Sequence, residues 1–268
     1  MNFQWTILKY FLEADNVCFS FGDVKAAFSE KNPAYLSQVL SKMVRTGKLI
    51  KLKRGLYYIV PMGQDGKSYI PDWHLVAKHL MKGKNYYIGY YSAMQIHKLI
   101  TQPSLTETIV VDTQIKPNIL KIQGVRFQFI YHNQRRFFGI QKTWIDDYNK
   151  ANCSDLEKTL VDSYIAPQHS GGIVEVAKAT YQAKDKTDIE KLFGYFTKAG
   201  SKVAARRYVY ICDLFGISGF HHELFLKNNL SNVILRLDPS LPDQGKIIVK
   251  YGLRINHDFE TIKQAIYS

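Results

Sequence analysis

The sequence contains little cysteine and no long hydrophobic run. Three cysteines occur among 268 residues, and no two of them form a Cys-x-x-Cys pair. This spacing indicates neither a disulfide framework nor a cysteine-type zinc site. No segment approaches the roughly 18 to 20 consecutive apolar residues that span a bilayer, and the N-terminus lacks the pattern of a signal peptide. We therefore expect a cytoplasmic protein that does not enter the membrane.

Sets of catalytic or metal-binding residues are also missing. His74 and His79 are five residues apart and would not share one face of a helix. Ser201 and Asp213 have the spacing of the serine and first acid of a nucleotidyltransferase. Two-metal chemistry needs a second carboxylate two residues later, and that residue is Phe215. The sequence therefore predicts no enzyme activity, no metal and no cofactor.

Positive charge is in clear excess. Lysine and arginine number 36 against 23 acidic residues, which gives a formal net charge of +13. Such an excess favours polyanionic partners such as nucleic acid. Hydrophobic residues make up 46% of the chain, enough for well-packed cores, and the length suggests about two domains.

The N-terminal segment predicts three helices followed by a hairpin. Apolar residues recur with helical spacing in 2–14 and 22–28. A third helix begins after Asn32, a capping residue followed by proline, and ends at Gly47, which suits a left-handed terminus. Alternating residues in 49–60, interrupted by Arg54-Gly55, predict a two-stranded ribbon with a tight turn. This order predicts a winged helix-turn-helix.

The third helix and the ribbon carry the candidate DNA-binding residues. In a helix-turn-helix the second helix of the motif enters the major groove with its outward-facing side chains. Glutamine pairs with adenine and arginine with guanine, and lysines contact phosphates. Between residues 42 and 54 there are six cations and no acid. The predicted contacts are Tyr35, Ser37, Gln38, Ser41, Lys42, Arg45, Lys48, Lys51, Lys53 and Arg54. One such domain has a small footprint, so we expect two copies on an inverted repeat.

The rest of the chain predicts a larger domain in which helices and strands are mixed. We expect an α+β protein with a DNA-binding domain at 1–62, a linker rich in glycine and proline at 63–71, and a second domain at 72–268. Strands are predicted at 86–89, 108–112, 125–132, 233–237 and 247–253. Helices are predicted at 73–81, 92–99, 154–164, 172–181, 189–199, 201–215 and 259–267.

Several segments resemble the AbiEi-type antitoxin family. Residues 40–60 resemble its winged-helix signature, with Arg54-Gly55-Leu56-Tyr57 closing the wing. Residues 86–99 are similar to a family segment in which a strand runs into a Ser-Ala-Leu helix. The strongest similarity is at 154–179, around the core 155–162 and the Gly171-Gly172 pair. Residues 201–213 and 250–256 resemble two more segments, although Tyr208 and Val209 depart from the family pattern.

This resemblance implies a function in two parts. The N-terminal domain would bind double-stranded DNA at its own promoter and repress its operon. The C-terminal domain would act as the antitoxin of a type IV toxin–antitoxin system, which provides phage defence by abortive infection. Its functional partner would be a nucleotidyltransferase-type toxin, with or without direct contact.

Two pairs of charged residues are candidates for the antitoxin surface. Lys158 and Asp162 lie one helical turn apart, and we expect them to pair on an exposed face. Arg206 and Arg207 predict a basic patch on a later helix. Ser154 is expected to cap the helix that carries the first pair. Two other functions stay open: a nucleic-acid-processing enzyme targeted by the winged helix, and a basic adaptor that binds RNA or an acidic protein.

Overall fold

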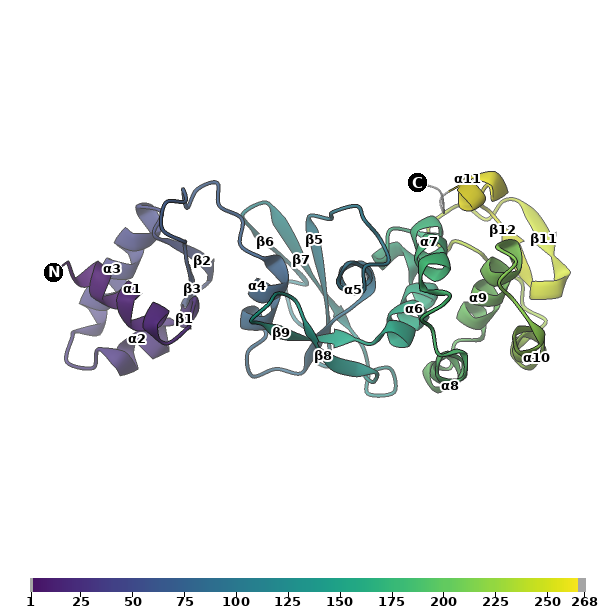
Figure 1. The fold of residues 1–268 in the computed structure, drawn as a ribbon, viewed down its shortest axis with the longest axis horizontal. Coiled ribbons are helices and arrows are strands. Elements are labelled where there is room, and N and C mark those ends of the chain that lie inside the picture. The colour runs from purple at the N-terminus through teal and green to yellow at the C-terminus, as the bar shows by residue number, and fades with distance from the viewer. Residues whose placement is uncertain (1, 265–268) are drawn as a thin grey trace. The chain divides into compact units, whose positions relative to one another are not determined.

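The computed structural model describes residues 2–264 and divides the chain into two compact units. The first unit comprises Met1–Gly83 and Lys121–Val125, and the second Lys84–Leu120 and Arg126–Ser268. Helices and sheets are mixed along the chain, which confirms the α+β class (Figure 1). The segment predicted as a linker, 63–71, lies within the first unit.

The first unit contains three helices and a small antiparallel sheet, followed by one more helix (Figure 1). Its elements are α1 (Phe3–Glu13), β1 (Cys18–Ser20), α2 (Phe21–Ala27), α3 (Pro33–Arg45), β2 (Leu49–Lys53), β3 (Leu56–Ile59) and α4 (Trp73–Leu80). The sheet order is β1-β3-β2, so the predicted hairpin gains a third strand. Cys18 pairs with Tyr58 and Ser20 with Leu56, an arrangement that the sequence did not predict.

The start of α2 is determined by a reciprocal cap. The Ser20 hydroxyl accepts from the backbone N–H of Asp23 at 3.0 Å, and the Asp23 carboxylate accepts from the backbone N–H of Ser20 at 2.7 Å. This capping box satisfies two donors that the helix leaves unpaired. As a result α2 begins at Phe21, one residue before the predicted start.

An aromatic and aliphatic core holds the first unit together. Ile7 of α1 and Leu36, Leu40 and Met43 of α3 are fully buried. Phe11 and Phe19 stack with ring centroids 4.1 Å apart. Since burial of a large apolar side chain contributes about 1.5–3 kcal/mol, this core determines which face of α3 points inward.

The second unit combines a mixed sheet with a group of helices (Figure 1). Its strands are β4 (Tyr86–Ile88), β5 (Thr106–Val111), β6 (Ile119–Ile122), β7 (Val125–Tyr131), β8 (Ile140–Trp144), β9 (Lys150–Ser154), β10 (Leu235–Arg236), β11 (Lys246–Ile248) and β12 (Leu253–Ile255). The end of β6 and the first residue of β7 fall in Lys121–Val125, which is grouped with the first unit. Its helices are α5 (Tyr90–Ile96), α6 (Leu156–Ile165), α7 (Ile173–Ala183), α8 (Ile189–Ala199), α9 (Lys202–Leu214), α10 (Phe220–Asn229) and α11 (Phe259–Gln264), with 3₁₀ turns η1 (Pro167–His169) and η2 (Val249–Tyr251).

The main sheet has six strands in the order β6-β7-β5-β4-β9-β8. β5 pairs in parallel with β7, β4 in parallel with β9, and β4 antiparallel with β5. A second sheet has the order β10-β12-β11. The predicted strand at 247–253 is wrong as one element, because η2 separates β11 from β12. The last helix begins at Phe259 as predicted, and its predicted end at residue 267 lies outside the described residues.

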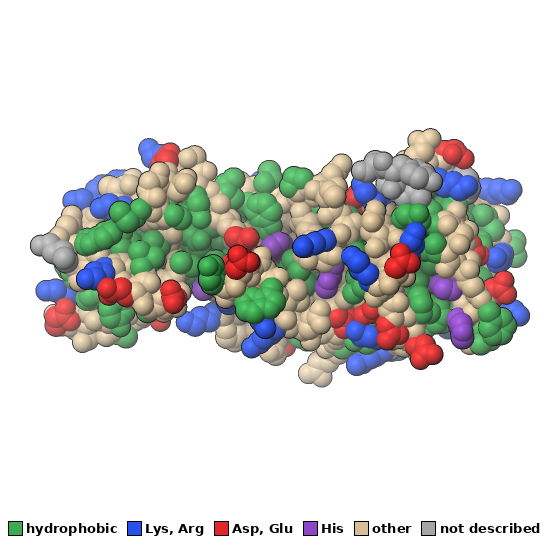
Figure 2. Space-filling model, viewed as in Figure 1, with side chains coloured by type: hydrophobic (Ala, Val, Ile, Leu, Met, Phe, Trp, Pro, Cys, Tyr) green, Lys and Arg blue, Asp and Glu red, His purple; other side chains and the backbone are tan. Residues whose placement is uncertain are grey.

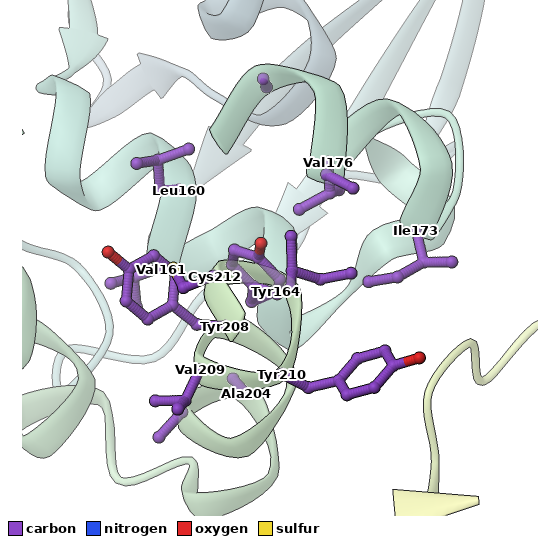
Figure 3. Close-up of a cluster of buried hydrophobic side chains, with 14 of the residues drawn as sticks. Leu160, Val161, Tyr164, Ile173, Val176, Ala204, Tyr208, Val209, Tyr210 and Cys212 are labelled. Carbon is purple, nitrogen blue, oxygen red and sulfur yellow. The ribbon is translucent and has the colours of Figure 1, made fainter. Parts of the chain in front are cut away.

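The core of the second unit lies between its helices. Figure 3 shows Val161 and Tyr164 of α6 beside Tyr208 and Cys212 of α9. The rings of Tyr164 and Tyr208 meet edge to face, with centroids 5.6 Å apart. Within residues 2–264, no helix combines the length and the apolar character needed to cross a bilayer.

Candidate nucleic-acid interface

Helix α3 is positioned by the local signals that predict it. The Asn32 side chain accepts from the backbone N–H of Ala34 at 2.8 Å, and Pro33 occupies the first turn. After the helix, Gly47 takes the left-handed conformation with φ of 73°. Both ends therefore follow from residue types that favour helix termini.

The outward face of α3 carries the predicted base-reading side chains. Gln38, Ser41 and Arg45 are spaced three to four residues apart and are all exposed. At 3.6 residues per turn they lie opposite the buried stripe that ends at Met43. Ser37 and Lys42 flank this row and are exposed as well.

Tyr35 is partly held by a contact within the first unit. Its ring stacks on Phe3 of α1 with centroids 5.7 Å apart, while 45% of the residue is exposed. The stack limits how far this ring extends from the helix. Tyr35 is thus placed to contact a ligand mainly through its hydroxyl end.

The hairpin of β2 and β3 presents two kinds of cation. Within residues 2–264, Lys51 and Arg54 are exposed and their charged groups have no protein partner. By contrast, Lys48 donates to the side-chain oxygen of Gln4 at 2.9 Å, and Lys53 donates to the carbonyl oxygen of Leu80 at 3.1 Å. Binding of phosphate by the latter two would compete with these contacts.

The arrangement suits a polyanion with a groove, such as a nucleic-acid duplex. An amide, a hydroxyl and a guanidinium lie along one helix face, and cations lie on the hairpin that follows it in the chain. On the face drawn in Figure 2, lysine and arginine side chains are scattered among acidic and apolar ones rather than gathered in one field. Net charge alone therefore marks no site, and the candidate interface is defined by α3 and its hairpin.

The prediction that Lys158 and Asp162 lie on an exposed face is wrong. Lys158 and Asp162 do pair, with Nζ 2.5 Å from Oδ1, but both side chains have no exposed area. The helix that carries them is buried on nearly every side. It begins after Asp155, which accepts from the backbone N–H of Lys158 at 2.8 Å, and the predicted cap, Ser154, belongs to β9.

A polar network that the sequence did not predict surrounds this pair. The Tyr87 hydroxyl donates to Asp162 at 2.8 Å and contacts Nδ1 of His132 at 2.9 Å. The Tyr90 hydroxyl contacts Nε2 of His132 at 2.8 Å, and Arg136 donates to that hydroxyl at 3.3 Å. Because the Tyr87 proton goes to Asp162, His132 must donate from Nδ1 and accept at Nε2.

Burial and charge set the protonation states in this network. Burial lowers the pKa of His132 to about 3, helped by Arg136 and against the effect of Asp162, so the ring is neutral at pH 7. Burial alone would raise the pKa of Asp162, but the positive charges of Lys158 and Arg136 bring it below its ordinary value. Lys158 and Asp162 therefore form a charged pair inside the unit.

Arg206 and Arg207 are also buried, with 1% and 4% of each residue exposed, so the predicted basic patch is wrong. Arg206 donates to the carbonyl oxygens of Val233 and Gly252 at 2.9 and 3.1 Å. Arg207 donates to the carbonyl oxygen of Tyr164 at 3.0 Å and twice to that of Arg236. These guanidinium groups join α9 to α6, to β10 and to the segments that hold Val233 and Gly252.

The residues with nucleotidyltransferase spacing have structural contacts. Ser201 caps α9 by accepting from the backbone N–H of Ala204 at 3.4 Å. The Asp213 carboxylate accepts from Nζ of Lys250 at 2.7 Å and from the Tyr251 hydroxyl. In the part of the chain that the structure describes, no three His, Cys, Asp or Glu side chains converge as metal ligands.

No protein-family model and no curated protein matches this sequence. The structure resembles the crystal structure of the RV2827C protein from Mycobacterium tuberculosis. The match has a TM-score of 0.72 and 14% sequence identity, and covers 98% of this chain and 94% of the other. At this identity the likeness concerns the fold alone.

Proposed function

We propose that residues 3–60 form a winged helix and that the protein binds double-stranded DNA through α3 and the β2–β3 hairpin. The order α1, β1, α2, α3, β2, β3 agrees with this architecture. The proposal rests on one observation: Gln38, Ser41 and Arg45 are exposed along one face of α3 while the opposite face is buried. A helix with such a face fits the major groove.

The chemistry of the row supports sequence-specific contact. The amide of Gln38 matches the edge of adenine, and the guanidinium of Arg45 matches that of guanine, each through two hydrogen bonds. Lys51 and Arg54 have no protein partner within residues 2–264, so phosphate contacts there would break no existing interaction. Each phosphate neutralised steepens the salt dependence of binding by roughly 0.9 in log–log slope.

We further propose that two copies bind an inverted repeat in the promoter of the protein's own operon and repress it. The resemblance to AbiEi-type antitoxins supports this role and the accompanying one, neutralisation of a nucleotidyltransferase-type toxin. The most family-like segment includes Lys158 and Asp162, which are buried. If the protein contacts a toxin, the contact must therefore use other residues of the second unit.

The test compares DNA affinities of matched variants. Arg45→Ala and Gln38→Ala should each weaken binding to the promoter duplex by about 1–3 kcal/mol, measured by fluorescence anisotropy. Lys9→Ala removes a cation from α1, where Lys9 pairs with Glu13 at 3.6 Å, and should leave affinity nearly unchanged. Footprinting on the same promoter locates the half-sites.

Two outcomes would contradict the proposal. Equal losses in Arg45→Ala and Lys9→Ala, with Gln38→Ala unchanged, would show that only net charge matters, which favours a basic adaptor for RNA or an acidic protein. Unchanged affinity in Arg45→Ala and Gln38→Ala would remove α3 as the recognition element. Toxin neutralisation is scored separately, by growth of cells that express the toxin beside each variant.

A further inference from the structure

A polar pocket of about 470 Å³ lies on the main sheet of the second unit. The parallel pairing of β5 with β7 sets Thr106 beside Arg126 and Thr108 beside Gln128. Since side chains two residues apart share one face of a strand, these four side chains cover one patch of the sheet. The remaining lining residues are Tyr91, Ser104, Gln168, His169 and Gly171.

The protein uses some polar groups of this pocket and leaves others without a partner. The Tyr91 hydroxyl donates to the carbonyl oxygen of Gln102 at 3.2 Å, and the Ser104 hydroxyl to that of Thr106 at 3.4 Å. Thr108 lines the pocket, and its hydroxyl makes no hydrogen bond to residues 2–264. The same holds, within those residues, for the side chains of Arg126 and Gln128. Polar side chains that line one pocket without a protein partner keep their hydrogen-bonding capacity for a ligand or for water.

The charge of the pocket favours an anion. Arg126 is the cation of the lining, and the lining contains no carboxylate. Burial lowers the pKa of His169, and Arg136 lowers it further, so this ring is a neutral hydrogen-bonding group at pH 7. Glu175 lies just outside, where a β-carbon placed on Gly171 would come within 2.9 Å of its Cγ and 3.2 Å of the Tyr91 ring.

We infer that this pocket binds a phosphate-bearing small molecule, with Arg126 on the phosphate and the hydroxyls and amides of β5, β7 and η1 on its remaining oxygens. Its volume falls in the roughly 300–1,000 Å³ range of small-ligand sites. A guanidinium binds phosphate oxygens in pairs, which gives the site its orientation. Tyr91 and His169 supply flat rings beside it. The inference is independent of DNA binding, because no lining residue belongs to α3 or its hairpin.

The experiment titrates the full chain by calorimetry with four probes: inorganic phosphate, ribose 5-phosphate, AMP and adenosine. The three phosphate-bearing probes should bind and adenosine should not. AMP binding more tightly than ribose 5-phosphate would identify a nucleotide site, and equal affinities a sugar-phosphate site. Arg126→Ala should weaken binding by about tenfold or more, because a charged hydrogen-bonding group is lost.

Matched variants separate this pocket from other basic surfaces. Thr108→Val keeps the shape of the side chain and removes the unpaired hydroxyl. It should weaken binding and leave the unfolding temperature nearly unchanged, because the hydroxyl makes no hydrogen bond to residues 2–264. Glu175→Gln should strengthen binding, since it removes a nearby negative charge. Lys142→Ala, an exposed change on β8, and Arg45→Ala should leave binding unchanged.

The inference fails if no phosphate-bearing probe shows saturable binding, or if binding survives unchanged in both Arg126→Ala and Thr108→Val. Loss of binding in Arg45→Ala alone would assign the probes to the proposed DNA-binding face. If adenosine bound as tightly as AMP, the phosphate would contribute nothing to the affinity, which would contradict the inference.

Discussion

Substitution of Asp162 should lower the free energy of unfolding more than substitution of its partner Lys158. In Asp162→Asn the buried ammonium of Lys158 and the guanidinium of Arg136, which lies 3.4 Å from the carboxylate, lose their counter-charge. In Lys158→Met, Asp162 keeps Arg136 and the hydroxyl of Tyr87. The two variants therefore leave different numbers of buried groups without a partner.

The magnitudes follow from the cost of unpaired buried charge. Removal of one partner of a buried ion pair costs about 3–5 kcal/mol, which we expect for Asp162→Asn. For Lys158→Met we expect about 1–3 kcal/mol, because the carboxylate keeps hydrogen bonds. The surface pair Lys9–Glu13 has the same spacing, with side chains 53% and 67% exposed, so Lys9→Met should cost less than about 0.5 kcal/mol.

The assay must resolve the second unit, because two units need not unfold together. Hydrogen exchange of peptides from α6, followed by mass spectrometry, reports the local free energy of opening. A double variant, Lys158→Met with Asp162→Asn, should cost less than the sum of the two single losses. The reasoning is refuted if Lys158→Met costs more than Asp162→Asn, or if both behave like the surface control.

Two further predictions concern pH and helix capping. His132, with a pKa near 3 against an ordinary 6.5, stays neutral in the folded state while the unfolded state takes up a proton, so stability should fall as pH drops from 6.5 toward 3. His132→Asn should flatten this slope by up to about 1.4 kcal/mol per pH unit in denaturation at several pH values, and an unchanged slope would contradict the assignment. Asn32→Ala should cost about 0.5–2 kcal/mol in hydrogen exchange of α3, because Ala34 loses its acceptor. Unaltered protection of α3 would rule out that role.

Much of the first unit follows from short-range signals. Asn32-Pro33 predicts the start of α3, Gly47 its end, and Arg54-Gly55 the turn of the hairpin, where Gly55 has φ of 73°. Each signal acts within a few residues. β1 escaped prediction because three residues are too few to show a period, and its pairing with β3 depends on residues nearly forty positions away.

The second unit was harder to predict, because its buried charged residues find their hydrogen-bond partners in segments far away in the sequence. Charged side chains are rarely buried unless paired, so Lys158 and Arg206 were expected at the surface. Their partners come from other segments: Tyr87 for Lys158, Val233 and Gly252 for Arg206. Local spacing predicted only the contact one helical turn away, between Lys158 and Asp162.

α10 gave no clear helical signal for a different reason. Phe220 and Leu224 are exposed, at 75% and 50%, while Phe225 and Leu226 are buried. Its apolar residues therefore do not form a single stripe, and a periodicity argument cannot find the helix. β8 was missed similarly, since four of its five residues are exposed and no alternation is visible.

The strand β1 ties the hairpin tip to the beginning of α2. The backbone N–H of Phe21 donates to the carbonyl oxygen of Gly55 at 2.8 Å, one residue beyond the cap at Ser20. A tip anchored in this way has lost its conformational freedom before any ligand arrives. In the proposed DNA complex its ordering should carry little entropic penalty, so Arg54 at the tip and Lys51 on the adjoining strand β2 would meet the phosphate backbone in a prearranged position.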